Sequence, residues 1–361
     1  MIRNFNEYKQ RHLAFWQLSQ VERPLIGFSI GSGLDSWSYW QDNKATRALL
    51  QRKQIFAEDI NPEDFIEDQL KYLELYQQIN DDVCRTAMPL ASIPWMEAIL
   101  GCPVISTETS IKSKAILADA DSLKPISFDP DNPWVKKYLQ FIEVYTLAFG
   151  EKFPVAQSVL RGPSDLACAL LGAEKATMAL AMEPQAMHRL LDYVTGQLEK
   201  FLQLQLIHLP KFQEGYVIGQ YEIWAPEPVL RIQEDFSLMY SPTLYDEFLK
   251  TLDERLAGLA KYTLMHLHAS SLFLIDKFLE VSQIRVFQVT KDEGGSRLSD
   301  MLPALLKIQR ASKPLILKGR FDESDLELMK HNLSSCGLCL QPVVGSLAEA
   351  ENIFSMLRKL C

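Results

Sequence analysis

A short apolar segment followed by a longer helical pattern recurs along this chain, and this recurrence constrains the fold more than any other feature. Several of the apolar segments are near-continuous runs of Val, Ile and Leu, which is typical of parallel strands covered on both faces. Eight strand candidates follow one another: 25–30, 82–87, 154–160, 216–221, 262–268, 285–290, 315–319 and 338–342. Eight strands alternating with helices predict an α/β fold, a (β/α)8 TIM barrel.

Two of the gaps between predicted strands are long, and we interpret both as insertions at the barrel mouth, one after strand 1 and one after strand 2. The residues before the first strand predict an N-terminal helical extension. No repeat and no Gly/Ser-rich linker divides the chain, so we expect a single barrel domain over residues 1–361. A doubly wound open sheet is the alternative, but no GxGxxG turn follows the first strand.

Composition narrows the classes of partner. The formal net charge of −9 argues against a non-specific nucleic-acid binder, because phosphate contacts need clustered Lys and Arg. No apolar run approaches the roughly 18 residues of a membrane helix, and the first residues lack the apolar region of a signal peptide. Six cysteines are too sparse for a disulfide scaffold, so we expect a protein of the reducing cytoplasm.

The predicted strand 262–268 ends with two histidines in the run Tyr-Thr-Leu-Met-His-Leu-His. Residues i and i+2 of a strand share a face, so His266 and His268 project together. In a TIM barrel the carboxyl ends of the strands carry the active site, and both histidines are therefore candidate catalytic residues. Two imidazoles on one face suit zinc, whereas a single one can shuttle protons or simply sit hydrogen-bonded in the core.

Two carboxylates are candidates to act with these histidines. Glu222 ends the predicted strand 216–221 on the same face as Gln220, and Trp224 continues into the loop. Glu222 could be a general base or a third metal ligand, or it could pair with an arginine of the barrel. Asp235 lies ahead of the next predicted helix, at the mouth, and is the second candidate catalytic carboxylate. We expect Gln220 and Trp224 to contact substrate.

The remaining candidates are substrate-binding residues at other strand ends. Arg161 follows the strand 154–160 and could hold a substrate carboxylate in bidentate fashion. Trp95 and Glu97 lie in the second insertion, as a lid would, although a helix start with a core tryptophan would look the same. Gln288 and Lys318 belong to the sixth and seventh strands, where Lys318 could hold an anionic group or join a charge network.

Four segments together resemble the uroporphyrinogen decarboxylase superfamily, which includes the cobamide-dependent methyltransferases. They are Leu-Arg-Gly-Pro-Ser-Asp-Leu at 160–166, the stretch 234–248, the His-Leu-His strand end, and Trp-Met-Glu-Ala-Ile-Leu-Gly-Cys at 95–102. The resemblance implies a (β/α)8 barrel whose deep mouth suits a tetrapyrrole, a corrinoid or a methylated small molecule. It also implies a corrinoid protein as a possible partner and allows a homodimer.

The chain departs from the superfamily at two places. The Arg-Gln-Ala-Gly-Arg-Tyr signature of uroporphyrinogen decarboxylases is absent, and the N-terminal region offers Arg11 and Arg23 instead. The methyltransferase branch binds zinc through a His-x-Cys pair and a later Cys. Here His268 replaces the first thiolate and the later position falls near Val343. A site made of His266, His268 and Glu222 would suit zinc, and it would activate water or an oxygen substrate better than a thiol.

Three functional interpretations remain open at this point. The first is a corrinoid-linked methyltransferase with an altered metal site, in which zinc is the possible metal and the corrinoid comes from a partner protein. The second is a uroporphyrinogen decarboxylase-like lyase acting on a tetrapyrrole or a small carboxylate, with Arg161 holding the carboxylate. The third is a non-catalytic binding barrel that has lost the metal.

Overall fold

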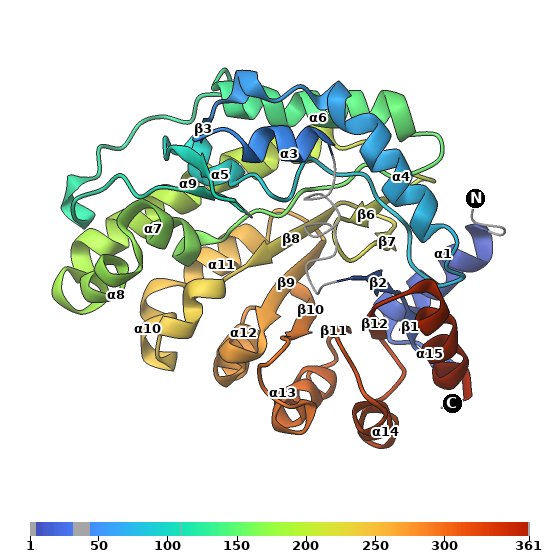
Figure 1. Cartoon of the computed structure of the whole chain (residues 1–361). Coiled ribbons are helices and arrows are strands. Elements are labelled where there is room, and N and C mark those ends of the chain that lie inside the picture. Colours follow the sequence, from blue (N-terminus) through green and yellow to red (C-terminus); the bar gives the residue numbers. More distant parts are fainter. Residues whose placement is uncertain (1–4, 32–43, 109, 360–361) are drawn as a thin grey trace.

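The computed structural model describes residues 5–31, 44–108 and 110–359, so residues 32–43 of the first predicted insertion lie outside it. The fold is α/β, with a mainly parallel central sheet and helices packed around it (Figure 1). The strand order is β1-β12-β11-β10-β9-β8, with β2 beside β12, and these pairs are all parallel. The sheet comprises β1 Leu25–Ile26, β2 Ser29–Ile30, β8 Val229–Gln233, β9 Tyr262–His268, β10 Ile284–Lys291, β11 Leu315–Gly319 and β12 Leu338–Val344.

The helices follow the strands as predicted. The α-helices are α1 Phe5–Gln17, α3 Lys44–Leu50, α4 Ile66–Tyr76, α5 Trp95–Ile99, α6 Pro133–Phe149, α7 Pro163–Leu171, α8 Ala173–Met182, α9 Pro184–His208, α10 Pro242–Phe248, α11 Lys250–Ala257, α12 Ile275–Glu280, α13 Leu298–Arg310, α14 Glu323–Asn332 and α15 Leu347–Lys359. Short 3-10 helices are η1 Ala57–Asp59, η2 Pro62–Phe65, η3 Ala120–Ser122, η4 Asp235–Met239 and η5 Ala269–Leu274. No helix among the described residues is long and apolar enough to cross a bilayer.

Helix α1 confirms the predicted N-terminal extension, and local capping explains several of the other boundaries. Ser241 precedes α10 and its side chain accepts a hydrogen bond from Leu244 N, while Pro242 occupies the first helical position, where its missing N–H costs nothing. Asp322 and Asp325 form a capping box at the start of α14, each carboxylate accepting from the other residue's backbone N–H.

Two predicted strands, 82–87 and 154–160, are extended segments rather than members of the ladder. Their backbone pairings are isolated: a parallel bridge joins Ala87 and Val155, and Asp82 N donates to Ile26 O at 2.7 Å. Side chains satisfy further backbone groups: Gln157 bonds both the N–H and the C=O of Arg231 at 2.9 Å, and an Asp82 oxygen accepts from Ile26 N at 3.0 Å. The arrangement is TIM-barrel-like, and no continuous ladder closes it within the described ranges.

The predicted fourth strand was wrong. The run 216–221 forms β6 Tyr216–Ile218, which pairs with β7 Ile223–Ala225 in an antiparallel hairpin outside the parallel ladder. The parallel strand is β8, with the sequence Val-Leu-Arg-Ile-Gln, and it pairs with β9. A second small antiparallel sheet, of β3 Gln54–Ile55, β4 Val104–Ser106 and β5 Ile111–Ser113, lies in the inserted regions.

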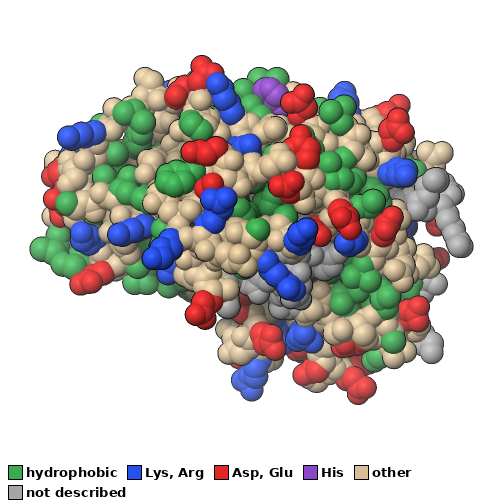
Figure 2. All heavy atoms as spheres, turned by 45° about the horizontal axis from the view of Figure 1, so that its top comes forward, with side chains coloured by type: hydrophobic (Ala, Val, Ile, Leu, Met, Phe, Trp, Pro, Cys, Tyr) green, Lys and Arg blue, Asp and Glu red, His purple; other side chains and the backbone are tan. Residues whose placement is uncertain are grey.

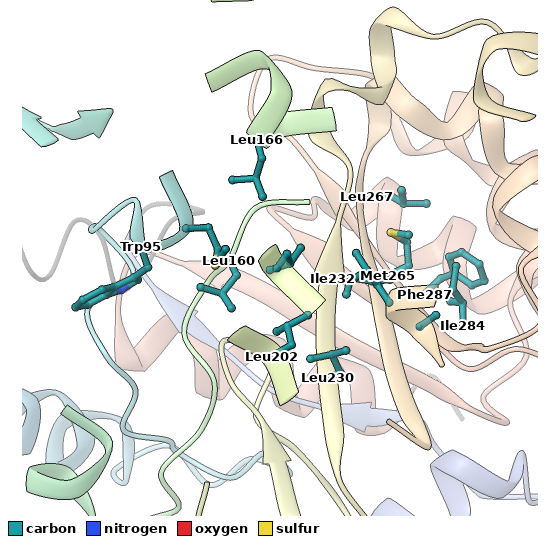
Figure 3. Packing of buried hydrophobic residues seen from close by; sticks show 14 of the residues in the cluster. Trp95, Leu160, Leu166, Leu202, Leu230, Ile232, Met265, Leu267, Ile284 and Phe287 are labelled. Atoms are coloured by element: carbon teal, nitrogen blue, oxygen red, sulfur yellow. The ribbon is translucent and has the colours of Figure 1, made fainter. Parts of the chain in front are cut away.

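One face of the sheet packs against the helices in a large apolar core. Leu230 and Ile232 of β8 and Met265 and Leu267 of β9 belong to this core (Figure 3). The alternate residues of the strands face the barrel interior, because successive side chains of a strand point to opposite sides. The interior is apolar at its lower end, which is the end toward the amino termini of the strands. Residues of α1 and of the β6–β7 hairpin cluster there with Val229, Leu264, Val286, Ile316 and Cys339.

Two residues further along each of these strands, the interior becomes polar. The five positions are Arg231, His266, Gln288, Lys318 and Gln341, and each is at most 5% exposed. Because they lie two residues beyond the apolar set, they share its face and form the next layer toward the carboxyl ends of the strands. A functional site therefore has an apolar floor and polar walls.

Helix α1 closes the lower end of this interior through buried polar contacts. His12 Nε2 donates to Asp82 O at 2.7 Å, and its Nδ1 accepts from Trp224 N at 2.9 Å. Both ring nitrogens are thus used by a neutral imidazole, and burial lowers the pKa of His12 to about 4. Trp16 Nε1 donates to Trp224 O at 2.8 Å, so α1 is joined to the hairpin as well.

The low pKa of His12 makes the stability of the protein pH-dependent. Below its usual pKa the unfolded chain binds a proton that the folded chain refuses until about pH 4, so stability falls as the pH falls. From about pH 7.5 to about pH 5 this group alone should remove about 2 kcal/mol. The variant His12→Gln keeps a donor and an acceptor but does not titrate. Urea unfolding should show a smaller pH dependence for the variant, and an unchanged dependence would contradict this role.

Candidate metal centre

Three ligand-type side chains converge at the carboxyl ends of two neighbouring strands. His266 and His268 end β9, and Asp235 begins η4 directly after β8. The Nε2 atoms of the two histidines are 3.1 Å apart, and Asp235 Oδ1 is 3.9 Å from each of them. The predicted pairing of the two histidines on one face is therefore present, and Asp235 is the carboxylate that joins them.

The neighbours of the two imidazoles determine which nitrogen carries the proton. Gln288 Nε2 donates to Thr290 Oγ1 at 3.1 Å, so the carbonyl oxygen of Gln288 faces His266 Nδ1 and can only accept. His268 Nδ1 is 2.7 Å from Asp292 Oδ1, which also accepts. Both Nδ1 atoms therefore carry protons when the rings are neutral, and two Nε2 lone pairs face each other.

This arrangement requires a positive charge between the rings. Two lone pairs 3.1 Å apart repel each other, and the nearby Asp235 carboxylate adds negative charge. Asp235 Oδ1 is buried and makes no hydrogen bond among the described residues, whereas Oδ2 accepts from Gln233 Nε2 at 2.8 Å. A proton on one ring would relieve part of the repulsion, and a metal ion bound by all three atoms would relieve all of it.

The donor set fits zinc. In a tetrahedral zinc site with bonds of about 2.0–2.2 Å, donor atoms lie roughly 3.3–3.6 Å apart, close to the 3.1 and 3.9 Å seen here. Three protein ligands leave the fourth position open, which is typical of catalytic rather than structural zinc. The side chains of His268 and Asp235 are 32% and 39% exposed, so small molecules can reach this position.

The pKa values of the two histidines diverge. Burial, together with the charges of Arg231 and His268, lowers the pKa of His266 well below its usual value, so this ring stays neutral. Burial also acts to lower the pKa of His268, but its hydrogen bond to Asp292 and the charge of Asp235 outweigh it, and the net effect raises that pKa. His268 is therefore the ring that takes the proton when no metal is bound.

Asp165 holds the third ligand in place. Its Oδ1 accepts from Phe236 N at 2.7 Å, and its Oδ2 lies 3.3 Å from Asp235 N and 3.2 Å from Gln233 Nε2. It also completes the cap of α7, because its Oδ2 accepts from Gly162 N at 3.3 Å. Burial and the neighbouring Asp235 raise the pKa of Asp165 to about 7.

Tyr221 is a site residue that the sequence reasoning missed. It lies in the turn of the β6–β7 hairpin between Gln220 and Glu222, whose φ angles are +66° and +59°. Such left-handed conformations cost roughly 1–2 kcal/mol per non-glycine residue, and here they turn Tyr221 into the barrel. Its hydroxyl lies 2.8 Å from His266 Nδ1, beside the carbonyl of Gln288.

Glu222 is not a ligand of this cluster, which corrects the predicted His266–His268–Glu222 set. Its carboxylate accepts from Arg85 Nη1 at 2.6 Å and lies 3.3 Å from Thr86 N, both on the segment that follows the first insertion. The pairing with a buried arginine, one of the two roles that the sequence allowed, is the one observed. Gln220, Glu222 and Lys318 instead line a small polar cavity with Arg85.

The two candidate tryptophans are core residues, each 1% exposed. Trp95 packs against aromatic side chains of α6, among them Tyr138 and Phe141, and its indole N–H donates to Leu90 O at 2.9 Å (Figure 3 shows Trp95 at the edge of the core). Trp224 packs against α1, and its indole N–H donates to Phe212 O at 3.1 Å. Neither indole N–H is available to a ligand, because each is buried and already donates to a backbone carbonyl.

The structure also places the remaining predicted residues. Gln288 contacts His266, as described above. Arg161 extends from the end of the segment 154–160, and its Nη1 lies 2.9 Å from Glu97 Oε1 of helix α5.

Basic and acidic side chains are interspersed over the face of the molecule in Figure 2, with no single-sign field.

Comparisons with known proteins give a fold likeness. No protein-family model matches the chain, and no curated protein sequence does. Among solved structures, a methyltransferase from Methanosarcina mazei is similar, with a TM-score of 0.65, 14% sequence identity and 98% of both chains covered. At that identity the likeness concerns the fold, and it is consistent with a TIM-barrel-like arrangement over almost the whole chain.

The geometry predicts one divalent metal ion per chain. Protein purified without a histidine tag should contain zinc, or bind it stoichiometrically, and His266→Ala and Asp235→Asn should each weaken binding by at least 100-fold through loss of one of three ligands. Glu222→Gln is the matched control, because that carboxylate pairs with Arg85 instead. Competition with a chromogenic chelator measures the affinities. Equal loss of zinc in the Glu222 and His266 variants would contradict this ligand set.

Asp292 should tune the site without touching the metal. Its hydrogen bond to His268 Nδ1 fixes the tautomer that presents Nε2 to the ion. Asp292→Asn should therefore lower zinc affinity by about 10–100-fold, with no change in stoichiometry at saturating zinc. The same chelator competition tests this, and affinity equal to that of the unmodified protein would exclude an orienting role.

Proposed function

We propose that the protein is a metal-dependent methyl-transfer enzyme in which zinc is held by His266 Nε2, His268 Nε2 and Asp235 Oδ1. The observation that carries the proposal is the pair of opposed Nε2 lone pairs with an unpartnered carboxylate oxygen beside them. The fold likeness to a methyltransferase supports the reaction class, and so does the sequence resemblance to cobamide-dependent methyltransferases.

When bound, the metal would act as a Lewis acid that lowers the pKa of an acceptor group at the open position and makes it nucleophilic. The surrounding residues keep the ligands in their binding form. Gln288 and Tyr221 hold the Nδ1 proton of His266, and Asp292 holds that of His268. Asp165, with its pKa raised to about 7, is the carboxyl beside the cluster that can exchange a proton near neutral pH.

The ligand set favours a particular kind of acceptor. Two imidazoles and a carboxylate make a harder site than one with thiolates, and harder sites favour oxygen over sulfur ligands. We therefore expect an oxygen nucleophile to be methylated at least as readily as a thiol. The methyl donor in this proposal is a methylated corrinoid that a partner protein supplies, as in the methyltransferases that the sequence resembles.

The lyase and the binding-barrel interpretations make different demands. A decarboxylase acting on a small carboxylate could use Arg161 and a proton donor without any metal, and it would release carbon dioxide. A binding barrel would retain ligand affinity without turnover. Metal dependence therefore separates methyl transfer from both alternatives.

The test is anaerobic demethylation of methylcobalamin by the zinc-loaded protein, followed by the absorbance of the corrinoid. Alcohols and thiols serve as acceptors in parallel. The rate should exceed the uncatalysed rate and fall at least 100-fold in His266→Ala, because one of three metal ligands is lost. The control Glu222→Gln should retain the rate. Zinc binding without any demethylation would exclude corrinoid-linked transfer, and carbon dioxide release from carboxylates would favour the lyase.

A further inference from the structure

We propose that Arg161, held by Glu97, is the binding site for a carboxylate group of the substrate, placed beside the metal centre. The inference rests on the proposed function for the location of the reacting end, and it adds a substrate class: a small monocarboxylate whose other end carries the group that reaches the open metal position. The site has three parts, which are an unused donor edge, a buried anchor and a position at the rim of the cluster.

The guanidinium of Arg161 is half-exposed and underused. Its side chain is 48% exposed, and its charged partner among the described residues is Glu97. Other arginines around the barrel differ in this respect. Arg85 donates to Glu222 and to Phe28 O, and Arg231 donates to Gln233. An arginine has five N–H donors in a planar fork, so Arg161 keeps a complete bidentate edge for a ligand.

Glu97 fixes the position of this cation through a contact to one of its two terminal nitrogens. The carboxylate side chain is 2% exposed, and its Oε1 lies 2.9 Å from Arg161 Nη1. A buried carboxylate next to the guanidinium keeps the charge in place, since an unpaired buried carboxylate would be costly. The anchor sits on helix α5, next to the core residue Trp95.

Backbone packing puts Arg161 at the rim of the metal centre. The next residue, Gly162, lies against the backbone that leads to Asp235, so closely that a Cβ there would come within 1.8 Å of Gln233 O and 2.6 Å of a Glu234 oxygen. The charges of Asp165 and Asp235 both act on Arg161. In this proposal one substrate contacts the guanidinium and the open metal position together.

The charges around Arg161 favour a carboxylate over a more highly charged group. A single guanidinium fork matches the two oxygens of a carboxylate. A phosphate dianion would bring a second negative charge close to Asp165 and Asp235, whose charges already act on Arg161. The predicted ligand is therefore a monoanion, and a divalent metal offsets the charge of Asp235 when the substrate binds.

The experiment uses cobalt-substituted protein and two thiols that differ only in charge. 4-Mercaptobutyrate and the uncharged 4-mercaptobutyramide both give a thiolate–cobalt absorption band on binding, so affinity is read directly. We expect the carboxylate to bind about 10–100-fold more tightly in the unmodified protein, the range for a charge-assisted bidentate contact. Arg161→Gln should abolish this preference and leave the affinity for the amide unchanged. Arg189→Gln, which removes an exposed arginine paired with Asp121, is the matched control.

The outcomes separate this inference from the proposed function. Cobalt uptake with no preference for the carboxylate, or a preference that survives in Arg161→Gln, overturns the carboxylate site and leaves the metal centre standing. If no metal binds, the proposed function fails, and calorimetric titration of the metal-free protein with butyrate decides the present inference alone. Binding that Arg161→Gln weakens at least 10-fold supports the site, whereas absent or unchanged binding overturns it. Stronger binding of butyl phosphate than of butyrate would contradict the monoanion preference.

Discussion

Two imidazole nitrogens that both present lone pairs across 3.1 Å are the constraint from which the chemistry of this protein follows. The strand spacing brings the rings together, and hydrogen bonds from outside fix their tautomers. Gln288 and Asp292 each accept an Nδ1 proton, so neither ring can turn a donor toward the other without taking up an extra proton. The site is thus preorganised for a cation, and the orphan oxygen of Asp235 supplies the third contact.

The interior of the barrel has layers that support this centre. At the bottom, α1 and the hairpin close an apolar floor around residues such as Leu264 and Ile316. Above it, Arg231 and Lys318 lie about the ring of Tyr221, each 5.9 Å from its centroid, and Tyr221 reaches His266. Two buried cations in this layer help to keep His266 neutral, which a metal ligand has to be. The polar groups at the strand ends remain open to solvent.

The elements that are predicted best from the sequence are those whose local residue pattern agrees with their position in the fold. Strands 262–268 and 315–319 were found with their observed boundaries, because apolar runs with β-branched residues fill a parallel strand buried on both faces. Strand β8 was missed because Arg231 and Gln233 interrupt its apolar pattern. These two residues are polar because they face the polar interior. The apolar run 216–221 was mistaken for that strand, although it forms a hairpin.

The candidate site was predicted in part, for a related reason. The side-by-side histidines follow from the two-residue period of a strand, which sequence alone reveals. Asp235 was named as a catalytic carboxylate, but Glu222 was preferred as the ligand because it was placed at the end of the wrong strand. No local sequence pattern indicates that Glu222 pairs with Arg85 or that Tyr221 contacts His266, because these pairs are 137 and 45 residues apart in the chain.

The hairpin of β6 and β7 enters the barrel from below and is not hydrogen-bonded into the parallel ladder. The depth of the interior is therefore set by a piece of chain that the parallel strands do not depend on for their own pairing. A longer or shorter turn at 219–222 would raise or lower this floor, and it would also move Tyr221, whose hydroxyl contacts His266. The size of the molecule that fits here and the support of one candidate ligand are thus coupled through a single turn.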